Sequence, residues 1–143
     1  MRASIEQVMR KEFTVFKADD ALRTVVETFV PGDVAMMMPV VDAAGALVGI
    51  VEPHDLLRTD SAEQPLKMRE LARQDYVLAQ PGELVDQVQR DMMRKETENV
   101  AVVAAGDSKP VGIARANDIL QLRRWLMEEE TREPRKQPVA GSQ

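Results

Sequence analysis

The sequence lacks cysteine altogether, has one histidine, and takes only 3% of its 143 residues from the aromatic types. Without cysteine the chain has neither disulfides nor thiolate chemistry, which fits a reducing compartment. The single histidine, His54, excludes a Cys–His nucleophile, a histidine-rich metal site and the paired-histidine zinc motif. Glycine-rich phosphate loops and nucleophile elbows are missing too. We therefore expect no enzyme, no catalytic cofactor and no metal.

Long apolar stretches are also missing, because no run approaches the ~18 residues that span a bilayer. The start of the chain contains no apolar signal region. We expect a soluble, cytoplasmic protein with no direct membrane insertion, although the same composition suits the cytoplasmic part of a larger membrane protein. A net charge of −5 with both signs intermixed, together with few aromatics, argues against nucleic-acid binding.

The chain contains a repeated sequence pattern of short apolar runs separated by turn residues. The first copy covers residues 38–58 and the second covers residues 100–120. Such runs are typical of a strand, a turn, a second strand and an abrupt helix start. The matched positions are Gly49 with Gly112 and Asp55 with Asp118, and both pairs have the same offset. This recurrence predicts two copies of one supersecondary unit that bury their faces on each other.

Each copy is expected to open with a short helix, a strand and an amphipathic helix. In the first copy the capping box Ser4–Gln7 predicts the short helix, residues 13–16 a strand, and Asp19 or Asp20 a helix N-cap. The inward side chains of the amphipathic helix are Leu22, Val25, Val26 and Phe29. The second copy has its short helix at 68–71 and its first strand at 75–78. The inward side chains of its amphipathic helix are Leu84, Val85, Val88 and Met92.

The end of the second copy carries a longer helix, with an apolar stripe of Ile119, Leu122, Trp125 and Leu126. Trp125 belongs either to the core or to an exposed partner site. Three glutamates at 128–130 are poorly placed for a helix C-terminus, where the macrodipole disfavours anions. Two prolines, a glycine and few large apolar residues predict a disordered tail over 134–143. The predicted organisation is repeat 1 at 1–60, a linker at 61–66, repeat 2 at 67–127, and the acidic helix end with the tail at 128–143.

In order, spacing and recurrence, the two copies resemble a pair of cystathionine-β-synthase (CBS) domains, the tandem called a Bateman module. The matching pieces of the first copy are Val8-Met9-Arg10, Thr14-Val15-Phe16, Pro39-Val40-Val41-Asp42 and Gly49-Ile50-Val51-x-x-x-Asp55. Those of the second copy are Tyr76-Val77-Leu78, Val100 to Val103 and Gly112-Ile113-Ala114-x-x-x-Asp118. The resemblance covers roughly residues 4–126. It implies a mixed α/β (α+β) fold of two β-α-β-β-α units, packed sheet to sheet with pseudo-two-fold symmetry, and a disc-like homodimer of two such pairs.

The resemblance also implies two clefts for adenine nucleotides between the copies. In the family pattern Gly-apolar-x-Thr/Ser-x-x-Asp, the aspartate accepts hydrogen bonds from the ribose and the Thr/Ser donates to phosphate. The first strand, and the residues before Pro-Val-Val, of the opposite copy hold the base. Carried over, one cleft consists of Asp118, Ile113 and Arg115 with Thr14, Val15, Ala35 and Met36. The other consists of Asp55, Ile50 and Glu52 with Tyr76, Val77, Thr97 and Glu98.

The chain departs from this pattern at the Thr/Ser position, which is Glu52 in the first copy and Arg115 in the second. A carboxylate repels a phosphate, whereas a guanidinium attracts it and binds it in a bidentate way. The cleft at Asp118 is therefore the better candidate for a phosphorylated adenosine. The cleft at Asp55 is interpreted as degenerate, or suited to an uncharged adenosine.

Several alternatives remain open from the sequence alone. Helix capping explains Asp55 and Asp118 without any ligand, Arg115 fits a solvated charge, and Tyr76 fits strand packing as well as base stacking. The main hypothesis is a regulatory module that senses AMP, ADP or ATP and controls an attached or partner protein. The long last helix is similar to that of cytoplasmic CBS pairs in bacterial chloride channels and transporters, so a membrane-transport domain is one expected partner. The alternative is a ligand-free pair that acts as a dimerisation platform.

Overall fold

The computed structural model describes residues 2–29, 37–58 and 65–136, with side chains described as far as residue 131. The first half contains a 3-10 turn η1 (Ile5–Gln7), β1 (Phe16–Lys17), α1 (Leu22–Thr28), β2 (Met38–Val41), β3 (Leu47–Val51) and a 3-10 turn η3 (Pro53–Leu57). The second half contains α2 (Met68–Leu71), β4 (Val77–Ala79), α3 (Val85–Lys95), β5 (Asn99–Val103), β6 (Pro110–Arg115) and α4 (Ala116–Lys136). The fold is mixed α/β, as the resemblance implies.

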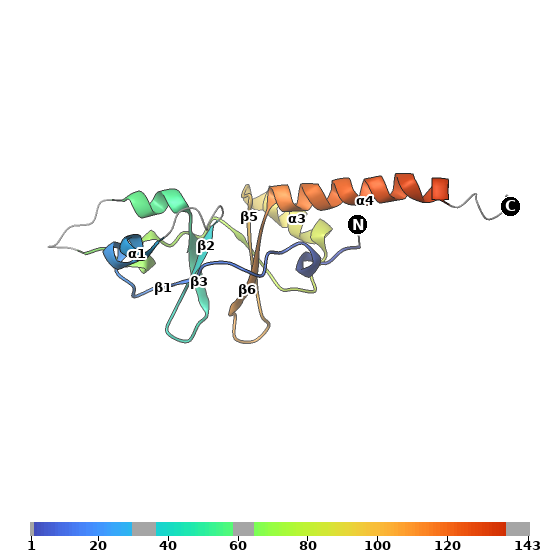
Figure 1. Ribbon diagram of the computed structural model, residues 1–143. Coiled ribbons are helices and arrows are strands. Elements are labelled where there is room, and N and C mark those ends of the chain that lie inside the picture. Colours follow the sequence, from blue (N-terminus) through green and yellow to red (C-terminus); the bar gives the residue numbers. More distant parts are fainter. Residues whose placement is uncertain (1, 30–36, 59–64, 137–143) are drawn as a thin grey trace.

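Two three-stranded sheets of identical topology form the centre of the molecule (Figure 1). In the first sheet β1 pairs with β2 in parallel and β2 pairs with β3 antiparallel, and β4, β5 and β6 repeat this order. Val40 faces Gly49 across one hairpin and Val102 faces Gly112 across the other. Each hairpin has its register irregularity immediately after that valine. The repeat read from the sequence is therefore a repeat of backbone structure.

The sheets meet face to face through a small cluster of buried side chains. Its members come from both halves of the chain: Met37, Ile50, Tyr76, Ala101 and Ile113. Phe13 and Leu47 pack against its edge. Because these residues belong to strands of both sheets or lie beside them, the cluster is the apolar layer that joins the two sheets.

The opening segment of each repeat packs on the sheet of the other repeat. Ile5 and Met9 belong to the core of β4–β6, whereas Met68 and Leu71 belong to the core of β1–β3. Figure 1 shows the N-terminal segment beginning beside α3 and α4 and crossing the molecule to β1. Full burial of an isoleucine such as Ile5 stabilises the fold by about 2 kcal/mol. This exchange of opening segments between the repeats therefore contributes to holding the two halves together.

This exchange also explains why neither expected aspartate caps α1. The residue before the helix is Ala21, and the first helical amide, on Leu22, donates to the carbonyl of Leu66 at 2.8 Å. Asp20 instead accepts from the amide of Lys17, and Asp19 pairs with Arg69. α3 repeats this arrangement, with the amide of Val85 donating to the carbonyl of Ala3 at 2.8 Å. Backbone from the linker, in α1, and from the opposite repeat, in α3, has taken the place of a side-chain cap.

Other boundaries also differ from the expected ones. The first strand begins at Phe16 because parallel pairing with β2 begins there, so Thr14 and Val15 lie before it. Val26 and Leu84 were expected to face inward and are instead half-exposed. The capping box is confirmed at its reciprocal bond, since the amide of Ser4 donates to the Gln7 side chain at 2.8 Å.

α4 continues through residues 128–136, where the acidic helix end and the start of a tail were expected. In Figure 1 it projects well beyond the sheets. Trp125 lies on its exposed surface and is not part of the core. Among the helices of the described ranges, none is long and apolar enough to cross a membrane.

Candidate functional site

The two motif aspartates occupy equivalent positions in the turn that follows each sheet. Asp55 lies in η3 and its Oδ2 accepts from the amide of Glu52 at 2.8 Å. Asp118 lies in the first turn of α4 and its Oδ2 accepts from the amide of Arg115 at 3.0 Å. Each carboxylate therefore stabilises the start of its own turn from inside. Within the described chain, the other oxygen of each, Oδ1, has no backbone donor.

An arginine from the opposite repeat contacts each of these carboxylates. Arg10, just after η1, donates from Nη2 to Oδ1 of Asp118 at 3.1 Å. Arg73, just after α2, donates from Nε to Oδ2 of Asp55 at 3.1 Å. Neither arginine was expected to be a site residue. The signal was present, however, because Arg10 and Arg73 have the same offset in the sequence as the two aspartates.

Backbone pairing fixes both arginines beside the motif strands. The amide and carbonyl of Arg10 exchange hydrogen bonds with Ile113 at 2.7 and 3.0 Å, and Arg73 does the same with Ile50 at 2.8 and 2.9 Å. The motif glycines permit this approach. A Cβ on Gly49 would lie 2.8 Å from the Cβ of Ala72 and 3.0 Å from the carbonyl oxygen of Arg73. A Cβ on Gly112 would overlap the side chain of Met9. The glycines therefore have a packing role that is independent of any ligand.

The two groups differ in charge, and we call them the Asp118 cluster (Arg10, Arg115, Asp118) and the Asp55 cluster (Glu52, Asp55, Arg73). In the Asp55 cluster, Nη2 of Arg73 also donates to Oε2 of Glu52 at 2.7 Å. Its two carboxylates are 13% and 19% exposed and share one guanidinium. In the Asp118 cluster Arg10 pairs with the one carboxylate. Arg115 contacts Asp118 through its backbone amide, and its guanidinium makes no ion pair within the described residues. The formal charges are therefore +1 for the Asp118 cluster and −1 for the Asp55 cluster.

Three of the predicted nucleotide-binding residues meet in the buried layer between the sheets. These are Ile50, Ile113 and Tyr76. The phenol of Tyr76 donates to Oε1 of Gln74 at 3.2 Å, and burial raises its pKa. Lys95 donates to the Tyr76 carbonyl at 2.7 Å and lies 5.3 Å from the ring centroid. Packing between the sheets therefore accounts for Tyr76.

The remaining predicted contacts are spread over different environments. Val77 is buried in the core of β4–β6, whereas Val15 is exposed and Thr14 is half-buried. Thr97 is buried; its hydroxyl donates to the carbonyl of Asp75 at 3.1 Å and accepts from the amide of Asn99 at 3.2 Å. Ala35 and Met36 lie outside the described residues.

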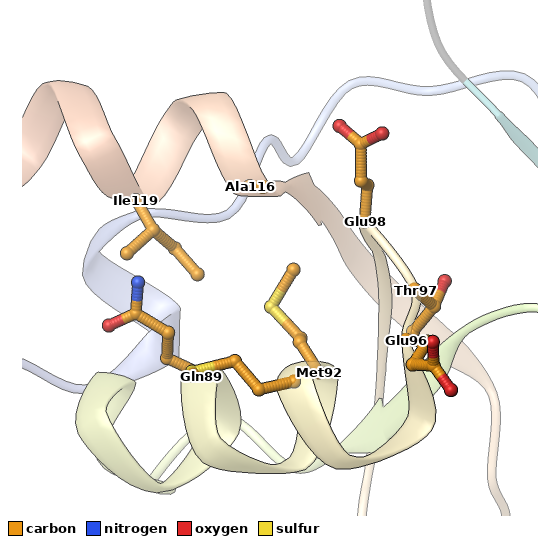
Figure 2. A pocket seen from close by; sticks show the side chains of 8 residues that line it. Gln89, Met92, Glu96, Thr97, Glu98, Ala116 and Ile119 are labelled. Carbon is orange, nitrogen blue, oxygen red and sulfur yellow. The ribbon is translucent and has the colours of Figure 1, made fainter.

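A cavity of about 270 Å³ lies beside Thr97 and Glu98, between α3 and α4 (Figure 2). Figure 2 shows Met92 and Ile119 extending into it from the two helices. Its walls come from the second half of the chain alone, so it is not a cleft between the repeats. It is also below the size range of drug-sized ligand sites. Within the described part of the chain, no group of histidine, cysteine, aspartate and glutamate side chains could hold a metal ion.

Comparison with known proteins gives three kinds of match: a family model, a curated protein and solved structures. A family model described as "CBS domain" matches residues 5–62 and 68–124. Among curated proteins, the uncharacterized protein MJ1225 of Methanocaldococcus jannaschii is 24% identical over 120 residues, which are 82% of this chain and 42% of that protein. The chain thus spans less than half the length of this relative.

Three solved structures have the same fold. The CBS domain pair of protein MJ0100, in complex with 5′-methylthioadenosine and S-adenosyl-L-methionine, has a TM-score of 0.67 at 21% identity, covering 85% of this chain and 96% of that one. The cytosolic domain of the Mg²⁺ channel MgtE in complex with ATP has a TM-score of 0.70 at 19% identity, covering 85% and 49%. CBSX2 in complex with AMP has a TM-score of 0.69 at 20% identity, covering 87% and 98%. At these identities the likeness shows the fold alone.

Proposed function

The chain belongs to the CBS domain family, and we propose that it is a regulatory module that binds an adenine nucleotide at the Asp118 cluster. Three proteins of the same fold were solved with adenosine compounds, namely ATP, AMP, and methylthioadenosine with S-adenosylmethionine. These ligands share an adenosine and differ in the charge attached to it. The charge of the receiving cluster therefore selects among them.

The observation that carries the proposal is the opposite charge of the two clusters. Arg10 and Arg115 accompany a single carboxylate at Asp118. A phosphate placed there would lie beside the guanidinium of Arg10, and the motif position of Arg115 would add a second guanidinium. Guanidinium groups bind such anions with charge-assisted hydrogen bonds. At Asp55 a phosphate would face Glu52 and Asp55, whose only ion-pair partner of fixed charge in the described residues is Arg73. We therefore assign phosphorylated adenosine to the Asp118 cluster.

The residues around the ligand follow from the family pattern. For the Asp118 cluster they are Ile113, Thr14, Val15, Ala35 and Met36. For the Asp55 cluster they are Ile50, Tyr76, Val77, Thr97 and Glu98. We propose that the second set holds an uncharged adenosine compound or no ligand.

The module is proposed to be regulatory rather than catalytic. Ligand binding would favour one relative packing of the repeats, and an attached or partner protein would respond to it. Such a response requires unequal affinity for the two arrangements. One structure of this fold is the cytosolic domain of a magnesium channel. A membrane-transport domain is therefore a candidate partner, together with a second copy of this chain in a homodimer.

Calorimetric titration with AMP, ADP and ATP, supported by thermal shift, tests the proposal. We expect binding to the wild type, loss of binding in Asp118→Ala, and nearly unchanged binding in Asp55→Ala. Absence of binding and of a thermal shift at millimolar concentrations of all three nucleotides would overturn the proposal.

A second candidate function is a ligand-free dimerisation platform. It is favoured by the fact that both motif aspartates already have arginine partners without any ligand. A stable dimer in light scattering, combined with silent titrations, is the expected result for that function.

A further inference from the structure

We propose that Arg10, which comes from the opening segment of the first repeat, is the residue that recognises the phosphate of the ligand at the Asp118 cluster. This inference rests on the proposed function and adds a specificity-determining residue to it. Nothing in the family pattern that identified the aspartates points to this position. The argument comes from the Asp55 cluster, where the equivalent arginine already holds an anion.

Arg73 shows what a guanidinium at this position can reach. It contacts the motif aspartate at 3.1 Å and, at the same time, the Glu52 carboxylate at 2.7 Å. Glu52 occupies the motif position whose family counterpart contacts phosphate. The carboxylate of Glu52 therefore stands in for the phosphate of a ligand. The Asp55 cluster is, in this sense, occupied by an anion of its own chain.

Arg10 has the same backbone setting and lacks the second anion. It is bridged to Ile113 as Arg73 is bridged to Ile50. Its one anionic contact within the described residues is Oδ1 of Asp118, and its side chain is 53% exposed. Arg115 replaces the carboxylate that Glu52 supplies in the other cluster. Arg10 therefore has N–H donors without a second anionic partner among the described residues, and no carboxylate of the motif other than Asp118 competes with a phosphate for them.

The contact between Arg10 and Asp118 also couples ligand binding to the packing of the two repeats. Ribose hydroxyls would compete for Oδ1 of Asp118, the oxygen that Arg10 now contacts. A guanidinium displaced from that oxygen finds its new partner in the phosphate. Because Arg10 belongs to the segment that packs on β4–β6, this exchange would alter a contact between the two repeats.

The test compares AMP with adenosine, which differ only in the phosphate, by calorimetry on the full chain. Arg10→Gln is expected to weaken AMP binding by about tenfold, the loss of one charge-assisted contact. Adenosine binding should not weaken, because the ribose no longer competes with Arg10 for Oδ1 of Asp118. Arg73→Gln is the matched control and should leave AMP binding at the Asp118 cluster unchanged. Arg10→Lys should retain part of the preference for AMP, because it keeps the charge without the planar fork.

A second variant tests the stand-in role of Glu52 independently of Arg10. Glu52→Gln removes the internal anion and leaves Arg73 with Asp55 alone. We expect the number of AMP molecules bound per chain to rise from one to two.

Each outcome separates the inference from the function on which it rests. If the wild type binds AMP and adenosine, and Arg10→Gln lowers both affinities equally or lowers neither, the role assigned to Arg10 is wrong. The proposed nucleotide site would still stand. If Glu52→Gln still binds a single AMP, the stand-in argument is wrong. If the wild type binds neither compound, the inference falls together with the proposed function.

Discussion

The Asp118 cluster and the Asp55 cluster have the same framework and opposite charge. In both, an arginine from the opposite repeat contacts a motif aspartate that also accepts a backbone amide. The residue three positions before the aspartate is arginine in one and glutamate in the other. That single difference leaves one guanidinium with a solvent-exposed side and gives the other a second carboxylate. The comparison teaches that the backbone framework determines where the two clusters lie, whereas this side chain determines the charge of each.

The symmetry of the framework extends through the backbone contacts that join the repeats. The amide of Ile5 donates to the carbonyl of Glu83 at 2.8 Å, and at the equivalent position of the second repeat the amide of Met68 donates to the carbonyl of Asp20 at 2.9 Å. Main-chain groups are present at every residue, so such contacts survive changes of side chain. Side-chain contacts have no such protection, and that is where the two clusters differ.

The largest effect on stability is expected at the motif glycines, where the segments of the two repeats approach each other most closely. Gly49→Ala places a Cβ 2.8 Å from that of Ala72 and 3.0 Å from a backbone oxygen, atoms that move only with the chain. We expect a loss of about 2–3 kcal/mol in the free energy of unfolding, in the range of overpacked cores. Gly112→Ala meets Sδ, Cγ and Cβ of Met9 instead. Another rotamer moves Sδ and Cγ away and leaves only Cβ at 3.0 Å, so a smaller loss of about 1 kcal/mol is expected.

Urea denaturation of both variants measures this difference. Gly82→Ala is the control, because a Cβ there meets no atom within 4 Å, and its free energy of unfolding should be unchanged or slightly higher. Equal losses at Gly49 and Gly112 would show that Met9 yields as little as backbone does. The close contacts at the two glycines would then be equally tight.

The next largest effect is a difference in stability loss between substitutions of the two arginines. Arg73→Gln leaves Glu52 and Asp55 facing each other, mostly buried and without their shared cation. We expect a loss of about 2 kcal/mol, the scale of hydrogen bonds to charged groups left unpaired. Arg10→Gln removes one contact of a half-exposed side chain, so a loss of about 0.5 kcal/mol is expected. Chemical denaturation at one ionic strength gives both values, and a larger loss for Arg10→Gln would contradict the assigned difference between the clusters.

The sequence predicted the parts of this architecture that recur locally. The spacing of Gly49 and Asp55 against Gly112 and Asp118 was sufficient to predict a doubled unit with two sheets. Hairpins with glycine turns followed from the same short runs, because alternation and turn residues are properties of neighbouring positions.

The contacts between distant segments could not be predicted in this way. Arg10 and Asp118 are 108 residues apart, and nothing in the sequence indicates that each opening segment packs on the other repeat's sheet. For the same reason Asp19 and Asp20 were wrongly expected to cap α1, where the carbonyl of Leu66 accepts the first amide. A comparison of all positions related by the repeat offset would have selected Arg10 and Arg73, although not their partners.

The smallest effect on the free energy of unfolding concerns the aspartates themselves. Which of the two substitutions costs more stability is the sharpest test of the charge difference between the clusters. Asp55→Asn keeps an oxygen for the amide of Glu52 and removes one of two carboxylates that repel each other, so we expect a change of roughly 0.3 kcal/mol or less. Asp118→Asn also keeps the acceptor for the amide of Arg115 but removes the carboxylate that pairs with Arg10, so a loss of about 0.5 kcal/mol is expected. Urea denaturation in low salt resolves the two variants, and added salt should reduce the gap because it screens half-exposed charges. A larger loss at Asp55, which has the greater number of charged contacts, would mean that contact number and not net charge determines the stability of each cluster.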